Sequence, residues 1–201
     1  MLVIGNGESR LGIDLDQIKD TKVGCNALYR DHYVRHLVCV DRRMVQEAID
    51  ARYNQDSIIY TRTDWQGYFK NTRHLRAVPE LPYVGNERWD EPFQWGSGPY
   101  AVLLGAKMAN KDLEVVRLIG FDLYGNADGK TNNIYKDTQN YNAGDKRAVD
   151  PRYWIHQIGM VFKCFPKVKF VVYQPTDWKL PKAWNYPNVT VDSISNIYYN
   201  T

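Results

Sequence analysis

The chain of 201 residues is 44% hydrophobic, 13% aromatic and 24% charged, which suits one folded domain with a substantial core rather than a disordered chain. Its net charge is only +3, and lysine and arginine are scattered without a long basic run, so binding to nucleic acid is not expected. No stretch approaches the roughly 20 apolar residues of a membrane span, and the first residues are typical of a strand rather than of a signal peptide.

The three cysteines, Cys25, Cys39 and Cys164, stand in apolar surroundings. An odd number in such positions indicates buried free thiols in a reducing compartment, so we expect a cytoplasmic protein. There is no Cys-x-x-Cys pair of the kind that builds structural zinc sites, and we predict neither a metal nor a cofactor.

The first part of the chain predicts buried strands joined by short helical segments. Residues 14–19 can form a helical turn, and residues 42–52 predict a helix because apolar residues recur there at helical spacing. The unbroken apolar run at residues 37–40 is typical of a strand covered on both faces. The strands predicted from such runs are residues 1–5, 21–26, 35–41 and 57–61.

Residues 63–95 contain prolines and many aromatic side chains, which predicts loops and short elements. We interpret this segment as an irregular lid or flap inserted into the domain. Its aromatic residues also favour an interface between copies of the chain, so a homo-oligomer is a further expectation.

Strand and helix alternate again in the second part of the chain. The predicted elements are a helix at 100–110 capped by Ser97, a strand at 114–120, a helix at 154–165, a strand at 167–173 and an edge strand at 189–193. Such alternation favours right-handed β-α-β crossovers. The prediction is therefore an α/β fold: a Rossmann-like three-layer domain with a mainly parallel sheet, formed by residues 1–201 as one unit.

Polar residues follow several of the predicted strands, where ligands bind in open parallel sheets. These residues are Asn6, Asn26, Asp41 and Asp122.

The turn at Gly5, Asn6, Gly7 and Ser9 is the first candidate for a binding site. Its glycines allow a tight bend that brings backbone N–H groups close to a ligand such as a phosphate. Arg10 occupies the third position of a G-x-G-x-x-G motif and no P-loop follows, so a plain strand-to-helix turn is the open alternative.

Gly96, Ser97 and Gly98 form a second candidate, because small residues leave the N-terminus of the following helix free for a phosphate or carboxylate. Simple N-capping by Ser97 is the alternative. Asp122 and Tyr124 form a third candidate past a buried strand, although Asp122 is also suited to accept hydrogen bonds from loop amides.

Three blocks of the sequence together resemble bacterial sialyltransferases that use CMP-sialic acid. The blocks are VIGNGES at residues 3–9 with Ile13-Asp14 and Gly24-Cys25-Asn26, then Gly96-Ser97-Gly98, then LIGFDLY at residues 118–124. They stand in the same order as in that family. The scaffold is also similar to archaeal hydroxymethylpterin diphosphokinases and to motility-associated glycosyltransferase-like proteins.

The resemblance implies a role for each matching position. Asn6 and Asn26 would contact the nucleotide, its phosphate or the sugar, and Gly96 and Ser97 would hold polar groups of the donor. Tyr124 would donate a hydrogen bond to the departing phosphate, which needs no metal. A second tyrosine of the family has its nearest counterpart in Tyr135.

Two positions depart from the family's pattern. Asp41 stands where the family tends to have an asparagine, which would place a negative charge near the phosphate. The general base, a histidine in the family, has no clear counterpart. Asp150 stands nearest to its position and His156 lies within the following predicted helix, so both are candidates.

Three hypotheses follow. The first is an inverting, metal-independent glycosyltransferase that takes a nucleotide sugar and an unknown acceptor. The second is a non-catalytic nucleotide-binding or interaction protein on the same scaffold. The third is a diphosphokinase, for which Asp41 and Asp122 would have to bind magnesium.

Overall fold

The structure is a computed structural model that describes residues 1–109 and 115–199. Eight strands form one sheet in the order β5-β4-β3-β2-β1-β6-β7-β8, and every neighbouring pair is parallel. The predicted α/β fold is therefore confirmed. The strands are β1 (Leu2–Ile4), β2 (Lys22–Cys25), β3 (His36–Val38), β4 (Ile58–Thr61), β5 (Leu75–Ala77), β6 (Val115–Ile119), β7 (Lys169–Gln174) and β8 (Val189–Ser193).

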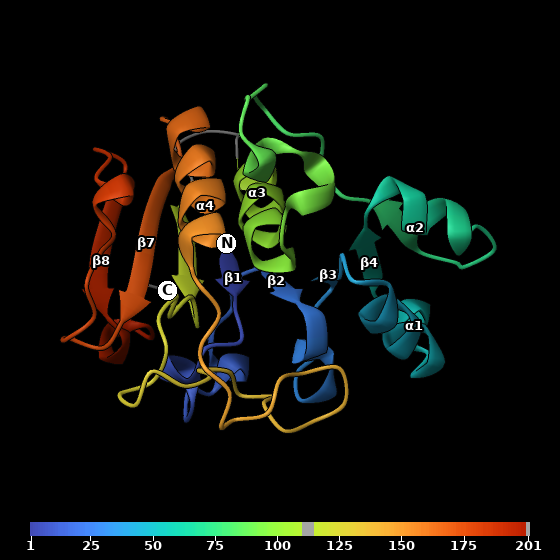
Figure 1. Ribbon diagram of the computed structural model, residues 1–201, viewed down its shortest axis with the longest axis horizontal. Coiled ribbons are helices and arrows are strands. Elements are labelled where there is room, and N and C mark those ends of the chain that lie inside the picture. Colours follow the sequence, from blue (N-terminus) through green and yellow to red (C-terminus); the bar gives the residue numbers. More distant parts are fainter. Residues whose placement is uncertain (110–114, 200–201) are drawn as a thin grey trace.

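Helices cover both faces of the sheet, consistent with a Rossmann-like three-layer domain. Helices α3 and α4 lie side by side over the central strands (Figure 1). Helix α1 packs Met44, Val45 and Ala48 against the opposite face, beside Leu37. The α-helices of the described residues are α1 (Arg42–Asp50), α2 (Thr63–Tyr68), α3 (Ser97–Ala109) and α4 (Arg152–Cys164).

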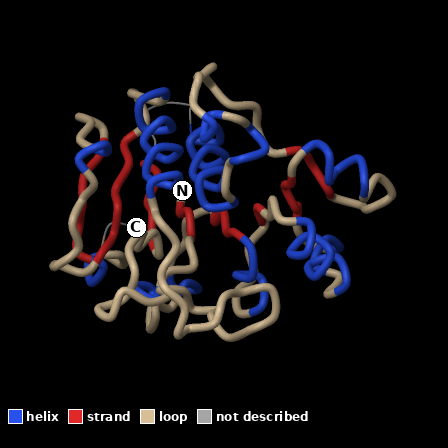
Figure 2. Tube along the Cα trace, viewed as in Figure 1, coloured by secondary structure: helices blue, strands red, loops and turns tan. Residues whose placement is uncertain are grey.

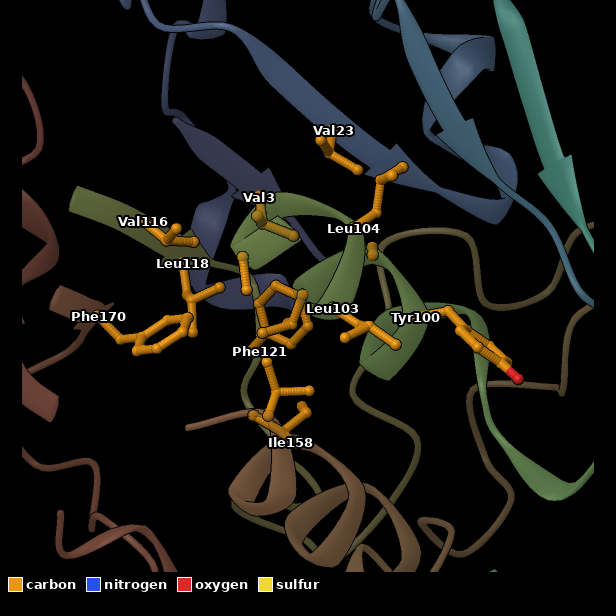
Figure 3. Close-up of a cluster of buried hydrophobic side chains, with 14 of the residues drawn as sticks. Val3, Val23, Tyr100, Leu103, Leu104, Val116, Leu118, Phe121, Ile158 and Phe170 are labelled. Atoms are coloured by element: carbon orange, nitrogen blue, oxygen red, sulfur yellow. The ribbon is translucent and has the colours of Figure 1, made fainter. Parts of the chain in front are cut away.

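The central helix α3 is buried on nearly all sides. Figure 3 shows Leu103 and Leu104 of this helix among Val3 and Leu118 of the central strands. A helix that is apolar around its whole circumference belongs in a core, and α3 meets the sheet on one side and α4 on another. This burial fixes the position of the N-terminus of α3 relative to the sheet.

The strand order reverses between β1 and β6. From β1 the chain builds β2 to β5 on one side, then crosses back to add β6, β7 and β8 on the other. In open α/β sheets ligands bind beyond the carboxyl ends of the strands at such a reversal. A ligand site is therefore expected at the segments that follow β1 and β6.

The loop of residues 120–151, here called the β6–α4 loop, runs along this carboxyl edge. It appears yellow to orange along the lower edge of Figure 1, and Figure 2 shows that it is free of helices and strands. Within it, Lys130 and Arg147 form an isolated antiparallel bridge.

Several local predictions are refined by the structure. Residues 63–95 include helix α2 and strand β5, and β5 extends the sheet beyond the strands predicted. Asp122 accordingly follows β6 rather than a fifth strand. The predicted helix end at residue 110 and strand start at residue 114 lie outside the described residues.

The start of α3 differs from the prediction. Tyr100 N–H donates to the Gly96 carbonyl at 3.1 Å, so Gly96 rather than Ser97 precedes the first turn. The Ser97 hydroxyl instead accepts a hydrogen bond of 3.0 Å from Val40 N–H, which ties the end of β3 to the helix.

None of the helices within the described residues combines the length and the apolar character that a membrane crossing requires.

Candidate functional site

An inner cavity of about 170 Å³ lies where β1 and β6 end, at the reversal of strand order. Segments far apart in sequence form its wall. They are the turn after β1, the end of β2, the start of α3, the segment after β6, part of the β6–α4 loop and one face of α4. Its lining residues are Gly5, Asn6, Gly7, Cys25, Asn26, Ser97, Gly98, Pro99, Gly120, Phe121, Asp122, Leu123, Tyr124, Asn132, Asn133, Trp154 and Ile158.

A larger outer cavity of about 650 Å³ adjoins the inner one and shares Asp122, Tyr124 and Asn132 with it. Its remaining wall comes from the turn after β1, the β6–α4 loop and the segment after β7. These residues are Glu8, Ser9, Gly125, Asn126, Ala127, Gln174, Pro175, Asp177, Trp178 and Lys179. Pockets for complete small-molecule ligands span about 300–1,000 Å³, so a complete ligand that enters the inner cavity must also extend into the outer one.

The backbone donors of the turn after β1 are used within the fold. Gly5 N–H donates to the Ile119 carbonyl at 2.8 Å, and Gly7 N–H donates to the Gly120 carbonyl at 2.9 Å. A Cβ at Gly5 would overlap with the Gly120 carbonyl oxygen. The glycines therefore allow the ends of β1 and β6 to approach each other, and these two N–H groups are not directed at a ligand.

Asp122 holds the next part of the same turn. Its carboxylate accepts hydrogen bonds from Ser9 N–H at 2.9 Å and from the Ser9 hydroxyl. A Cβ at Gly7 would overlap with that carboxylate, so the second glycine makes room for Asp122. Ser9 thus lines the outer cavity through a side chain already paired, and Asp122 fills the structural role that its position in the sequence suggested.

Asn6 and Asn26 both line the inner cavity, and each has a buried amide oxygen without a partner among the described residues. Asn6 is 8% exposed, and its Nδ2 donates to the Cys25 carbonyl and to the Tyr141 hydroxyl, both at 3.2 Å. Because the Cys25 carbonyl can only accept, it fixes the amide orientation and leaves Oδ1 on the other side. Within residues 1–109 and 115–199, neither Asn6 Oδ1 nor Asn26 Oδ1 has a hydrogen-bond partner. A buried acceptor without a partner costs about 1–3 kcal/mol, so both oxygens suit ligand hydroxyl or amino groups.

Asn26 adopts an unusual backbone conformation at this place. Its φ is 51°, in the left-handed region that asparagine tolerates better than most residues. The residue follows β2 directly and begins a short 3-10 turn, Asn26–Arg30. The bend positions the asparagine on the cavity wall at the end of the strand.

The N-terminus of α3 supplies backbone donors to the same cavity. Ser97 and Gly98 line it, and their N–H groups donate to no other group in the described part of the chain. The Ser97 hydroxyl accepts from Val40 N–H and so keeps its own hydrogen to donate. Free N–H groups and the helix dipole favour an anionic group here. Gly96 does not line the inner cavity, and its N–H donates to Gln157 Oε1 at 3.3 Å.

The two candidate tyrosines lie in different environments. Tyr124 is 39% exposed, lines both cavities and donates its hydroxyl to the Lys179 carbonyl at 3.2 Å. Burial raises the pKa of Tyr124, so its hydroxyl stays protonated as a donor. Tyr135 is 4% exposed and accepts a hydrogen bond of 3.1 Å from Arg10 Nη2. It lines neither cavity, so only Tyr124 stands at the site.

The candidate bases also lie apart from the cavities. His156 Nε2 contacts Asp90 Oδ1 at 2.7 Å, and its ring lies beside that of Trp89. Asp150 is exposed, and hydrogen bonds from Arg152 hold the pKa of this carboxyl below its usual value. Helix α4 presents Trp154 and Ile158 to the inner cavity, and a residue midway between them faces elsewhere.

Asp41 lies outside both cavities. Its side chain accepts a hydrogen bond of 2.8 Å from Arg43 N–H and caps α1. The magnesium site that would need Asp41 together with Asp122 is therefore not assembled by these residues. No cluster of three or more potential metal ligands occurs among the described residues. The pair His32-x-x-x-His36 forms none either, since His36 Nδ1 contacts the Tyr60 hydroxyl at 3.1 Å.

The cavity wall includes residues that the sequence patterns did not indicate. Asn132 lines both cavities, and its Oδ1 accepts a hydrogen bond of 2.8 Å from Glu8 N–H. Ile134 N–H donates to the Asn6 carbonyl at 2.9 Å, and the Tyr141 hydroxyl contacts Asn6. The β6–α4 loop thus covers the site, whereas no residue of the segment 63–95, which we expected to be a lid, lines either cavity. These loop residues follow no recognisable motif, although the adjacent pair Asn132 and Asn133 could have indicated a polar binding site.

Comparisons of the chain with protein-family models, with curated proteins and with solved structures gave no match. The likeness to sialyltransferases consequently depends only on the three blocks of residues described above.

Proposed function

We propose that the protein binds a nucleotide sugar across the inner and outer cavities. The observation that carries the proposal is that two residues lining the inner cavity, Asn6 and Asn26, each have a buried amide oxygen without a partner among the described residues. Such acceptors bind hydroxyl and amino groups, which sugars and nucleosides supply in number. They repel the oxygens of a phosphate, which are themselves acceptors.

The charge of the inner cavity supports the same ligand class. Among the described residues, Asp122 is the only one of its wall with a charged side chain, and no lysine or arginine lines it. A free polyphosphate would lack a cation there. One phosphate can bind the N–H groups at the start of α3, while the uncharged part of the ligand meets the asparagines and Trp154.

The nucleotide sugar is expected to bind without a metal, as the resemblance to sialyltransferases implies. A cytoplasmic location is part of the proposal, because the three cysteines are free thiols and such thiols are typical of a reducing compartment. A homo-oligomer stays a prediction that light scattering of the purified protein would decide.

A second candidate function, metal-independent glycosyl transfer, is favoured by the position of Asp122 and Tyr124. Both residues border the inner and the outer cavity. The Asp122 carboxylate, which keeps free lone pairs beside its hydrogen bonds from Ser9, would accept the proton of an acceptor hydroxyl as that oxygen bonds to the sugar. The Tyr124 hydroxyl would exchange its hydrogen bond to the Lys179 carbonyl for one to the departing phosphate. Release of the nucleotide from a nucleotide sugar measures this activity, and Asp122→Asn should lower it about a hundredfold or more.

The variant Asn26→Gly tests the binding proposal. Glycine accepts the φ of 51° and removes the amide oxygen without a cavity in the core. The expected loss of affinity is about tenfold. Isothermal titration with CMP-sialic acid, UDP-N-acetylglucosamine, GDP-mannose and ADP-glucose, each in the presence of EDTA, provides the measurement.

The matched control is Arg52→Gly, because Arg52 has a φ of 56° and lies far along the chain in the turn after α1. It should leave the affinity unchanged. Equal affinities for the wild type and Asn26→Gly would contradict the proposed role of Asn26, and failure of all four nucleotide sugars to bind the wild type would contradict the proposal itself.

A further inference from the structure

Gln174 is a buried glutamine whose amide has no partner. It is the last residue of β7 and is 1% exposed. Neither Oε1 nor Nε2 forms a hydrogen bond with the residues that the structure describes. Two unsatisfied polar atoms on one buried side chain are costly, and such groups are rare in folded proteins. Gln174 lies in the wall of the outer cavity, so a ligand there could supply what the protein does not.

Gln157 shows how this fold treats a buried glutamine with a structural role. It is 0% exposed, and its Oε1 accepts from Gly96 N–H at 3.3 Å. Its Nε2 donates to the carbonyls of Trp89 at 3.1 Å and Gln94 at 3.0 Å. All polar atoms of this amide are used, and Gln157 lines neither cavity. Gln174 differs from Gln157 in two respects: both polar atoms of its buried amide lack a partner among the described residues, and the residue lines a cavity.

Two aromatic side chains in the wall of the outer cavity favour a planar ligand group. Tyr124 and Trp178 stand in its wall with ring centroids 6.2 Å apart. The Trp178 indole donates to the Asp122 carbonyl at 2.8 Å, which fixes its ring. Planar ligand groups stack on such aromatic side chains.

The charged side chains of the outer cavity make a phosphate unfavourable there. Asp122 and Asp177 carry negative charges, as does Glu8, whose carboxylate is ion-paired with Lys136 outside this wall. Lys179 is the one positively charged residue of this wall within the described structure. A neutral planar group is therefore favoured over an anion.

We infer that the outer cavity binds the nucleobase of the ligand and that Gln174 selects among bases. A glutamine amide offers a donor and an acceptor side by side, and the edge of a nucleobase offers the complementary pair. The base would occupy the outer cavity, the ribose would pass Asp122 and Asn132 where the cavities meet, and the phosphate and sugar would lie in the inner cavity. This inference depends on the proposed nucleotide binding and adds where the base lies and what recognises it.

The first test needs no ligand. Gln174→Met keeps the size of the side chain and removes both unpaired atoms, so Tm should rise by about 2–4 °C. The matched variant Gln157→Met breaks three hydrogen bonds and should lower Tm by about 4–8 °C. A similar fall in Tm for both variants would show that Gln174 is bonded within the protein, and the inference would be overturned.

The second test uses CMP, UMP, GMP and AMP, which share ribose and phosphate and differ in the base. The wild type should prefer one of them over the weakest by about tenfold to a hundredfold, and Gln174→Met should reduce that ratio to less than about threefold. If the variant kept the full preference, the assignment of Gln174 would fail while nucleotide binding stood. If no nucleotide bound the wild type, the proposed function and this inference would fail together.

Discussion

Polar side chains are used differently on the two sides of this molecule. On the side of α4 that faces residues 88–96, His156 and Gln157 are tied to Asp90 and to backbone groups. At the carboxyl edge of the sheet, the amides of Asn6, Asn26 and Gln174 contain atoms without partners, and all three residues line a cavity. A satisfied polar group holds the fold together, whereas an unsatisfied one in a cavity wall indicates a ligand.

A few other buried polar atoms also lack hydrogen bonds, and their surroundings differ. Arg117 Nη2 is ion-paired with Asp20 at 2.8 Å. The remaining ones are one hydroxyl and two indole N–H groups at or near residues 63–95, and they line neither cavity: Thr61 Oγ1, Trp89 Nε1 and Trp95 Nε1. The combination of an unpaired amide with a cavity is thus confined to the carboxyl edge among the described residues.

The largest effect is expected at the turn after β1, which belongs to the satisfied part of the molecule. Gly5→Ala would force its Cβ against the Gly120 carbonyl, a backbone atom that cannot rotate away, and should cost about 3 kcal/mol of unfolding free energy. Urea denaturation measures it. Gly67→Ala is the control, because a Cβ in α2 meets nothing within 4 Å and should stabilise by about 0.5–1 kcal/mol. Equal stabilities for the two variants would show that the close approach of β1 and β6 is not needed.

His156 provides the next test, since it was a candidate base. His156→Ala removes a hydrogen bond to the largely buried Asp90 and should lower the unfolding free energy by about 1–2 kcal/mol. Nucleotide-sugar affinity and turnover should stay within about twofold, because the side chain lies outside both cavities. A loss of turnover at unchanged stability would show that His156 takes part in the reaction.

Substitutions of Tyr135 and Tyr124 should have opposite effects: the first should lower stability, and the second should lower ligand affinity. Tyr135→Phe removes the acceptor of Arg10 Nη2 and should destabilise by about 1 kcal/mol without changing affinity. Tyr124→Phe should leave stability nearly unchanged and weaken binding about threefold to tenfold. Thermal unfolding and titration of both variants give the comparison, and a reversed pattern would contradict the placement of the site.

The smallest effect concerns pH. Burial raises the pKa of Asp90, but hydrogen bonds from His156 and Tyr83 outweigh it and bring the pKa below the usual value. A lowered native pKa stabilises the fold above the unfolded-state pKa, and this contribution is lost as pH falls through the native pKa. Between pH 5 and pH 3, about the range of carboxyl titration, Asp90→Asn should therefore lose less stability than the wild type. An unchanged slope of stability against pH would show that Asp90 makes no such contribution.

Sequence reasoning predicted the fold because continuous apolar strands and amphipathic helices are local patterns. It also placed Asn6, Asn26 and Asp122 at one edge of the sheet, since strand ends in a parallel sheet coincide. It could not show that the N–H groups of the glycine turn donate to carbonyl groups at the end of β6, because that depends on which strands become neighbours.

Other parts of the site carry no local signal. Asn132 belongs to a long loop whose sequence shows no periodicity. Gln174 has the sequence pattern of an ordinary strand residue, and only the three-dimensional structure shows that its amide lacks partners. Asp41 and His156 lie outside both cavities for a related reason. Each found a partner close by, Asp41 at the start of its own helix and His156 in the segment before α3.

A thermal-shift titration of the wild type most directly tests whether the unpaired amides mark a ligand site. The ligands are CMP, UMP, GMP and AMP and their sugar conjugates, each with EDTA and with magnesium. A ligand at a hundred times its dissociation constant adds about 2.7 kcal/mol, which corresponds to a rise in Tm of about 5–10 °C. We expect such a rise, equal with and without magnesium, for nucleotides of one base. No rise with any nucleotide in a folded sample would contradict it.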